Sequence, residues 1–127
     1  MKCIKRCAES RPKDEWRLVR RNTRGIYALL ERLPKNKYKV VYVGKAVGTK
    51  RGIRGRLTKH SHSKRKGKRW THFSIYEVYE NIDQEQVDEL EGLFRHIYRK
   101  DPLANPLNLQ RGFKKLWKVR VNDLRKW

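Results

Sequence analysis

The hydrophobic positions of the chain fall into short segments that predict three strands. Residues 24–33 (RGIYALLERL) alternate in part, and residues 38–44 (YKVVYVG) are rich in β-branched and aromatic side chains, so both favour strands. Pro34 and Asn36 lie between them and indicate a hairpin turn. Residues 70–80 (WTHFSIYEVYE) predict a third strand.

Two helices are predicted around the third strand. Residues 51–60 (RGIRGRLTKH) indicate a short helix despite Gly55, and a longer one runs to about Arg99, with Asp83 as its N-cap. The order is strand, strand, helix, strand, helix and then a basic tail. This order predicts a mixed α/β (α+β) fold.

Glu91 lies in the middle of the apolar stripe of the longer helix. The stripe is formed by Val87, Leu90, Phe94, Ile97 and Tyr98. Burying an unpaired charge costs several kcal/mol, so Glu91 needs a partner there. An ion pair with Arg56 in the core is one explanation, and a metal ion or a wet cleft is the other.

Composition indicates what the partner of the protein is. The chain has 127 residues, which favours one compact domain, and 34 Lys and Arg against 13 Asp and Glu give a net charge of +21. Eleven of these basic residues and no acid lie in residues 45–69. Such a charge favours a polyanion, with nucleic acid ahead of membrane lipid.

Cellular location is expected to be the cytoplasm, in association with DNA or the nucleoid. No apolar run approaches the roughly 20 residues of a membrane span, and the N-terminus lacks the apolar segment of a secretory signal. Cys3 and Cys7 are interpreted as reduced thiols near a frayed end. Residues 1–21 are predicted to be a loosely attached basic arm, anchored by Trp16 and Leu18.

The shorter helix repeats the anomaly of the longer one, because Arg56 and His60 share a stripe with Ile53 and Leu57. A carboxylate, an arginine and a histidine beside a basic loop suit phosphodiester hydrolysis. The carboxylate can hold a divalent cation, arginine can grip phosphate, and a histidine or tyrosine can accept a proton from water.

An ordered set of motifs resembles the GIY-YIG endonucleases. The set comprises GIY at residues 25–27, YVG at 42–44, Lys45, Arg56 and His60 within RLTKH, Glu91 within ELEG, and an Asn in a Pro-containing segment. Tyr27 and Tyr42 would be the two signature tyrosines of this family. Packing within a sheet is the alternative explanation for tyrosines at these positions. The resemblance covers residues 24–110. The chain departs from the pattern at Val43 and in a longer turn between the motifs.

The resemblance implies a small three-stranded antiparallel sheet with flanking helices, and metal-dependent cleavage of nucleic acid, with DNA expected and RNA left open. It makes Glu91 the sole protein ligand of a single Mg²⁺ or Mn²⁺ ion and places Arg56 at the scissile phosphate. Tyr27, Tyr42, His60 and Lys45 would surround the attacking water, with Tyr27 favoured as the base and His60 as its partner.

Supporting roles follow from the same resemblance. Gly25 and Gly44 belong to the two signature motifs. The family asparagine is assigned to Asn108, with Asn105 as the alternative, and would orient the site through hydrogen bonds. Residues 22–110 would form the nuclease domain, and residues 111–127 a basic extension packed on or near it. Within that extension residues 117–121 alternate like a strand, whereas Phe113 and Trp117 are spaced as in a helix.

Nucleic-acid contacts are assigned to basic side chains of the loop and tail, because the chain has no separate targeting domain of comparable size. They are Lys50, Arg51, Arg54, Lys59, Lys64, Arg65, Lys66, Lys68, Arg69, Lys114 and Lys115. Contacts to phosphate predict little sequence preference and binding that weakens steeply with salt. Trp70, Phe113 and Trp117 could stack on bases or pack in the core. We expect a monomer or a transient dimer on DNA. The alternative function is a non-catalytic nucleic-acid-binding protein with this fold.

Overall fold

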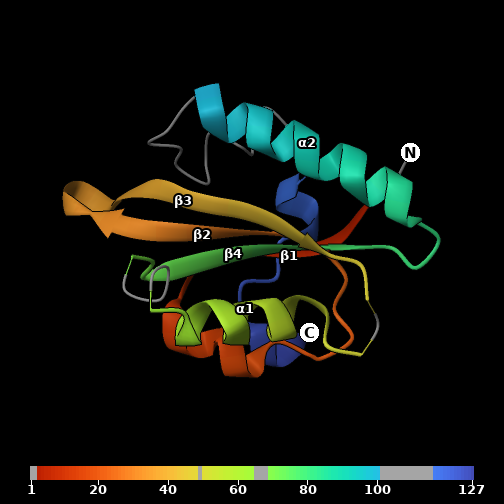
Figure 1. The fold of residues 1–127 in the computed structure, drawn as a ribbon, viewed down its shortest axis with the longest axis horizontal. Coiled ribbons are helices and arrows are strands. Elements are labelled where there is room, and N and C mark those ends of the chain that lie inside the picture. The colour runs from red at the N-terminus through yellow and green to blue at the C-terminus, as the bar shows by residue number, and fades with distance from the viewer. Residues whose placement is uncertain (1–2, 49, 65–68, 101–115) are drawn as a thin grey trace.

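The computed structural model describes residues 3–48, 50–64, 69–100 and 116–127, and it arranges them in three layers (Figure 1). The middle layer is a four-stranded antiparallel sheet in the order β1-β4-β2-β3. Its strands are β1 (Ile4–Pro12), β2 (Gly25–Leu33), β3 (Lys37–Ala46) and β4 (His72–Val78). Helix α2 (Gln84–Lys100) covers one face, while α1 (Gly52–His62) and the 3-10 helix η1 (Lys13–Leu18) lie on the other. The predicted α+β class is confirmed.

Strand β1 corrects the expectation of three strands and a loosely attached arm. It pairs with β4 along its length, with Cys7 opposite Tyr76. Both cysteines are free as expected, but Cys7 is buried in the sheet rather than near a frayed end. The hydrophobic pattern hides this strand because its small buried residues, Cys7 and Ala8, lie between charged neighbours. One of these neighbours, Arg6, forms an ion pair with Glu77 of β4.

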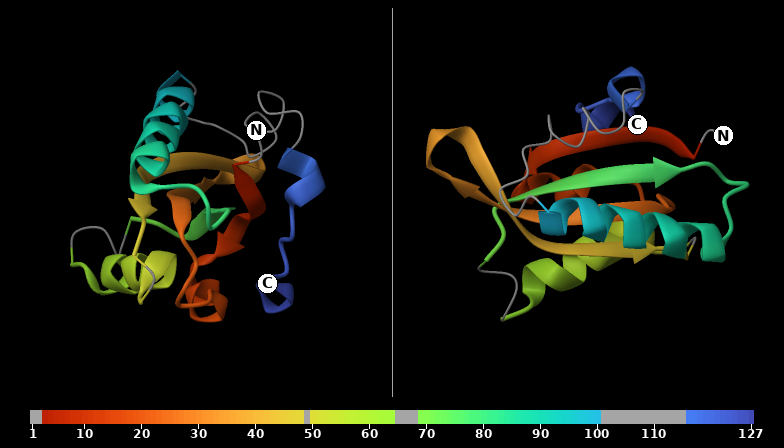
Figure 2. Two further views of the ribbon diagram at one scale, coloured as in Figure 1. Left: turned by 90° about the vertical axis from the view of Figure 1, so that its right-hand side faces the viewer. Right: turned by 90° about the horizontal axis from the view of Figure 1, so that it is seen from above.

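The C-terminal segment covers the free edge of β1, as the views in Figure 2 show. Arg120 forms a parallel bridge with Cys7, and the backbone N–H of Val121 donates to the Cys7 carbonyl at 2.8 Å. The side chain of Asn122 accepts from the N–H of Glu9 at 2.9 Å. An unpaired strand edge invites intermolecular pairing, so this segment protects the sheet. It consists of η3 (Leu116–Val119), the bridge and η4 (Leu124–Lys126). Sequence alone left residues 117–121 open between a strand and a helix, and the structure shows a 3-10 helix through Val119 followed by the single bridge at Arg120.

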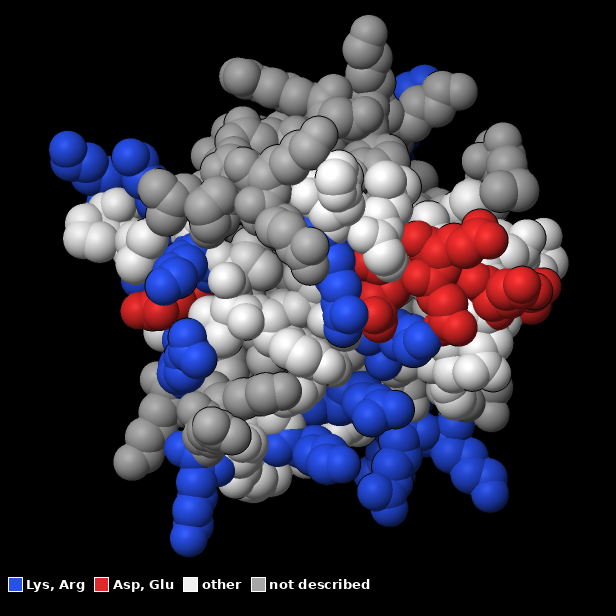
Figure 3. Space-filling model, turned by 45° about the horizontal axis from the view of Figure 1, so that its top comes forward, with Lys and Arg blue, Asp and Glu red and all other residues white. Residues whose placement is uncertain are grey.

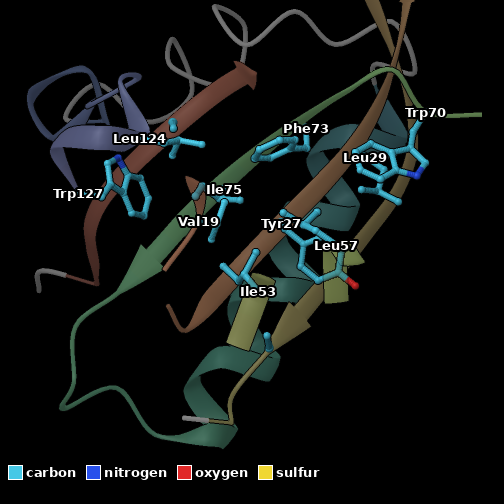
Figure 4. Packing of buried hydrophobic residues seen from close by; sticks show 12 residues of the cluster. Val19, Tyr27, Leu29, Ile53, Leu57, Trp70, Phe73, Ile75, Leu124 and Trp127 are labelled. Atoms are coloured by element: carbon cyan, nitrogen blue, oxygen red, sulfur yellow. The ribbon is translucent and has the colours of Figure 1, made fainter. Parts of the chain in front are cut away.

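Each face of the sheet carries its own hydrophobic core. In β2, residues 25–30 are all buried, because Ile26 and Ala28 pack on the α2 side and Tyr27 and Leu29 on the α1 side (Figure 4). A strand buried on both faces reads as a nearly continuous apolar run rather than a strict alternation. This explains the imperfect alternation of residues 24–33.

The helices begin and pack largely as predicted. The Asp83 carboxylate accepts from the N–H of Gln86 at 2.8 Å, and the Gln86 side chain accepts from the N–H of Asp83 at 3.0 Å. This reciprocal capping box confirms the start of α2. In α1, Ile53 and Leu57 are buried, but Arg56 is exposed and does not share their buried stripe.

The anchoring of the N-terminal segment differs in part from the prediction. Trp16 packs against the core on the α1 side, as expected. Leu18 does not anchor the chain, because 41% of its surface is exposed. None of the helices in the described ranges is long and apolar enough to cross a membrane.

Candidate active site

The pairing of β2 with β3 places the two signature tyrosines on one face of the sheet. Tyr27 lies opposite Gly44, and Leu29 lies opposite Tyr42. Directly paired residues of antiparallel strands point to the same face, so both tyrosine rings face α1. Their ring centroids are 6.0 Å apart.

Steric crowding in the packed sheet explains why the two motif positions, 25 and 44, hold glycine. A Cβ atom on Gly44 would lie 2.5 Å from the hydroxyl oxygen of Tyr27 and 2.7 Å from Cε1 of Tyr42. The absence of a side chain at Gly44 therefore lets both rings occupy this position. Gly25 has a φ of +150°, and a Cβ there would lie 2.0 Å from the carbonyl oxygen of Tyr76 on β4.

Helix α1 brings His60 to these tyrosines. The hydroxyl oxygen of Tyr27 lies 2.9 Å from Nε2 of His60, and the ring centroids of Tyr42 and His60 are 5.0 Å apart. The N-terminus of α1 is fixed by a hydrogen bond of 2.8 Å from the N–H of Ile53 to the carbonyl of Thr23. The sequence motifs thus predict three side chains, Tyr27, Tyr42 and His60, that lie in contact in the structure.

Gly52 is a positioning residue that sequence reasoning missed. It has a φ of +53°, and a Cβ there would lie 2.3 Å from the carbonyl oxygen of Thr23. Only glycine adopts this conformation readily at so close an approach. The only indication in the sequence was a glycine at the start of a predicted helix. The backbone that Gly52 approaches, at Thr23 just before β2, is distant in sequence.

Tyr27 is held in its protonated form. Burial raises the pKa of its hydroxyl above the ordinary value of 10.0, the neighbouring Tyr42 adds to the increase, and the Arg56 guanidinium opposes it. At neutral pH the resting side chain is therefore a neutral phenol. The influence of Arg56 also shows that this exposed arginine lies within electrostatic reach of the Tyr27 hydroxyl.

Glu91 lies on α2 within electrostatic reach of Tyr27 and is not paired with Arg56. Its carboxylate forms an ion pair of 3.1 Å with Arg95, one turn later on α2, and 13% of its side chain is exposed. Its negative charge raises the pKa of Tyr27. The core pairing of Glu91 with Arg56 is thus wrong, and Arg95 is the partner that the sequence pattern did not single out, although its spacing of four residues was visible.

Lys45 reaches α2 rather than the tyrosines. It forms an ion pair with Asp88, and this hydrogen bond raises the pKa of the Lys45 amine. Asp88 lies one turn before Glu91 on the same helix. Asp88 had no role in the sequence-based prediction of the site.

The donor chemistry at Glu91 fits a magnesium-type ion. Among the described residues, no group of three or more His, Cys, Asp and Glu side chains gathers as a metal cage. Mg²⁺ keeps several of its waters and is commonly bound through one or two carboxylates, so a cage is not required. Glu91 supplies one such carboxylate, partly open to solvent, and Arg95 would have to yield its place.

Basic side chains surround the exposed part of α1. Two open pockets lie beside the helix, and Lys50 and Arg51 line both of them. The first pocket is also lined by Arg56 and Lys59. The second pocket is also lined by Arg54. Figure 3 shows Lys and Arg gathered in its lower part, where α1 lies, and Asp and Glu gathered over the start of α2. Lys64 and Arg69, which flank residues 65–68, are exposed.

Several predicted residues lie outside the described ranges. They are Asn105, Asn108, Arg65, Lys66, Lys68, Lys114 and Lys115. No protein-family model, curated protein or solved structure matches the chain. The resemblance to the GIY-YIG endonucleases therefore stays a prediction based on the motifs.

Proposed function

We propose that the protein is a metal-dependent endonuclease that hydrolyses phosphodiester bonds of nucleic acid, with DNA as the expected substrate. The observation that carries the proposal is the contact of Tyr27 with His60 beside Tyr42. A binding surface alone has no need of a buried phenol hydrogen-bonded to an imidazole. Such a pair next to exposed cations suits proton transfer during attack on a phosphate.

Tyr27 and His60 act as a proton relay in this proposal. A neutral buried phenol is a poor base by itself, and the raised pKa of Tyr27 excludes a resting phenolate at neutral pH. The hydroxyl can take a proton from the attacking water only as its own proton passes to Nε2 of His60, 2.9 Å away. His60 is therefore the final acceptor, and Tyr27 orients the water.

Arg56 and Glu91 serve the phosphate. Arg56 is exposed within electrostatic reach of Tyr27, so its guanidinium can bind the scissile phosphate. Glu91 would hold a single Mg²⁺ or Mn²⁺ ion, which when bound neutralises the phosphate and stabilises the leaving oxygen. Before Glu91 can bind the ion, its carboxylate must release the ion pair that it forms with Arg95.

The basic surface beside α1 supports a nucleic-acid partner. Lys50, Arg51, Arg54 and Lys59 form it with Arg56, and a net charge of +21 draws a polyanion to it. Contacts of this kind position the phosphate backbone without reading bases, so little sequence specificity is expected. The protein would work as a monomer or a transient dimer on DNA, in the cytoplasm and associated with the nucleoid.

The decisive experiment compares the wild type with Glu91→Gln and Glu89→Gln on supercoiled, linear, branched and single-stranded DNA and on RNA, with Mg²⁺, Mn²⁺ or EDTA. Glu89 is an exposed carboxylate of the same helix, so it controls for the change in net charge. We expect metal-dependent cleavage by the wild type and Glu89→Gln and its loss in Glu91→Gln. Binding should be similar in all three.

A non-catalytic nucleic-acid-binding protein is the alternative, favoured by the net charge alone. Tight binding without cleavage under any metal would establish it and contradict the nuclease. Cleavage that persists unchanged in Glu91→Gln would contradict the assignment of the metal ligand.

A further inference from the structure

Trp16 is a partly buried tryptophan set among basic residues. It belongs to η1, packs against the core on the α1 side and lines an open pocket beside the exposed part of α1. The charged side chains of that pocket are Arg21, Lys50, Arg51 and Arg54, and none of the described residues that line it is acidic. A polyanion entering the pocket therefore meets an indole as well as four cations.

Arginine side chains flank the ring of Trp16. The guanidinium carbons of Arg17 and Arg54 lie 5.4 Å and 5.8 Å from the ring centroid. These distances are near the outer limit of about 6 Å for a cation–π contact, and such contacts at exposed sites contribute little. A nucleobase can replace a guanidinium on the indole, while the released arginine pairs with a phosphate.

The other described tryptophans do not offer this surface. Trp70 has 1% of its surface exposed and Trp127 has 2%, and both belong to the core on the α1 side. Core packing, one of the two roles predicted for Trp70, is therefore confirmed. The side chain of Trp117 lies outside the described part of the structure.

The surface around Trp16 is continuous with the candidate active site. Lys50 and Arg51 line both the pocket of Trp16 and the pocket that contains Arg56. Arg56 in turn lies within electrostatic reach of Tyr27. A nucleic-acid strand with a phosphate at Arg56 can therefore follow the cations across the start of α1 to the indole.

We infer that Trp16 stacks on an unpaired base of the bound nucleic acid and so selects substrates with a single-stranded segment. A base inside a duplex already has neighbours on both faces, whereas an unpaired base offers a free face to an aromatic side chain. The inference rests on the nucleic-acid partner of the proposed function but not on cleavage. Every base has such a face, so the selection is for structure rather than for sequence.

The test measures binding in EDTA, where no metal-dependent reaction occurs. Fluorescence anisotropy compares the affinity of the wild type, Trp16→Ala and Trp16→Phe for a single-stranded oligonucleotide and for a blunt duplex, each as DNA and as RNA. We expect Trp16→Ala to bind the single strand roughly tenfold more weakly, as loss of one stacked base predicts, and the duplex less than twofold more weakly. Trp16→Phe should recover most of the loss.

Leu18→Ala is the matched control, because this exposed residue of η1 does not line the pocket. It should leave both affinities unchanged. A second readout is the quenching of tryptophan fluorescence by single-stranded DNA, which should be much smaller in Trp16→Phe. If Trp16→Ala fails to fold, Trp16→Phe still allows the quenching test, because it keeps an aromatic ring packed against the core.

Two results would overturn the inference. One is an equal loss of single-strand and duplex affinity in Trp16→Ala, and the other is full quenching in Trp16→Phe. Absence of binding to every probe would contradict the partner as well as Trp16. Absence of cleavage together with selective loss of single-strand binding would contradict the nuclease and leave the stacking site standing.

Discussion

The hydroxyl oxygen of Tyr27 lies 2.9 Å from Nε2 of His60, across the space between the sheet and α1. The two residues are 33 positions apart in the sequence. Their contact depends on the register of β2 with β3 and on the hydrogen bond from the N–H of Ile53 to the carbonyl of Thr23, which anchors α1. This contact joins a strand to a helix at the point where the basic surface begins.

Removal of the Tyr27 hydroxyl should affect cleavage far more than binding. In Tyr27→Phe the relay to His60 is broken while the ring still fills the core. We expect the cleavage rate to fall about 100-fold or more, as for loss of a general acid–base group, with an unchanged dissociation constant for DNA. Single-turnover cleavage and anisotropy in EDTA measure the two quantities. A residual rate within twofold of the wild type would assign the proton transfer elsewhere.

Gly44→Ala should displace the tyrosines. Its new Cβ would lie 2.5 Å from the Tyr27 hydroxyl oxygen, so the Tyr27 ring must shift and its contact with His60 is disturbed. We expect a loss of about 1–3 kcal/mol in the free energy of unfolding, as for other overpacked cores, together with loss of cleavage. Urea denaturation measures the first effect. Gly48→Ala is the control and should change neither, because no atom of the described residues lies within 4 Å of a Cβ at Gly48.

Lys59→Ala should weaken the salt dependence of binding. Lys59 is exposed and lines the pocket that contains Arg56, so we expect it to contact one phosphate. The slope of log K against log salt should decrease in magnitude by about 0.9 for duplex DNA, whatever the sequence. The control is Lys39→Ala on β3, an exposed lysine that lines no pocket beside α1. Equal slopes for all three proteins would exclude Lys59 from the interface.

Arg120→Ala should detach the C-terminal segment from β1. Arg120 donates to the carboxylate of Glu9 at 3.2 Å, and only 2% of the Glu9 side chain is exposed. Removal of one partner of a fully buried ion pair costs about 3–5 kcal/mol. Because 31% of the Arg120 side chain is exposed, we expect a smaller but clear loss of thermal stability. Arg125→Ala is the control and should leave the thermal stability nearly unchanged, because 75% of the Arg125 side chain is exposed in its pair with Asp123 and water screens such a pair. Calorimetry of both variants makes the comparison, and equal melting temperatures would refute it.

Alkaline pH should destabilise the fold through Cys7. Burial raises the pKa of its thiol from 9.0 to about 12. Between these values the unfolded chain releases the proton while the folded chain retains it. The free energy of unfolding therefore falls with rising pH in this window, by up to about 1.4 kcal/mol per pH unit for one group. Urea denaturation at several pH values should show a shallower decrease for Cys7→Ala than for the wild type. Parallel curves would contradict the prediction.

Local sequence was sufficient for the elements with strong patterns. Residues 24–33 and 38–44 predicted β2 and β3 to within a few positions, and Asp83 marked the start of α2 through its capping box. These features depend on neighbours in the chain, which is why periodicity and capping residues reveal them. Strand β1 escaped because its pairing partner, β4, lies 60 or more residues away and its own apolar content is low.

The candidate site divides in the same way. Motif order and residue chemistry selected Tyr27, Tyr42 and His60, whose contacts the folded chain then displays. The partner of Glu91 could not be chosen among Arg56, a metal ion and solvent, because a helical wheel ranks faces and not distances. The structure gives Arg95.

The sequence by itself determined the class of fold, the strength of the positive charge and the set of residues suited to phosphate chemistry. The tertiary structure decided which of them meet, why Gly44 and Gly52 must lack side chains, and that Trp16 lies at the end of a continuous basic surface. The physical reason is that composition and periodicity are local properties, whereas steric exclusion and pairing of charges depend on segments brought together only by folding.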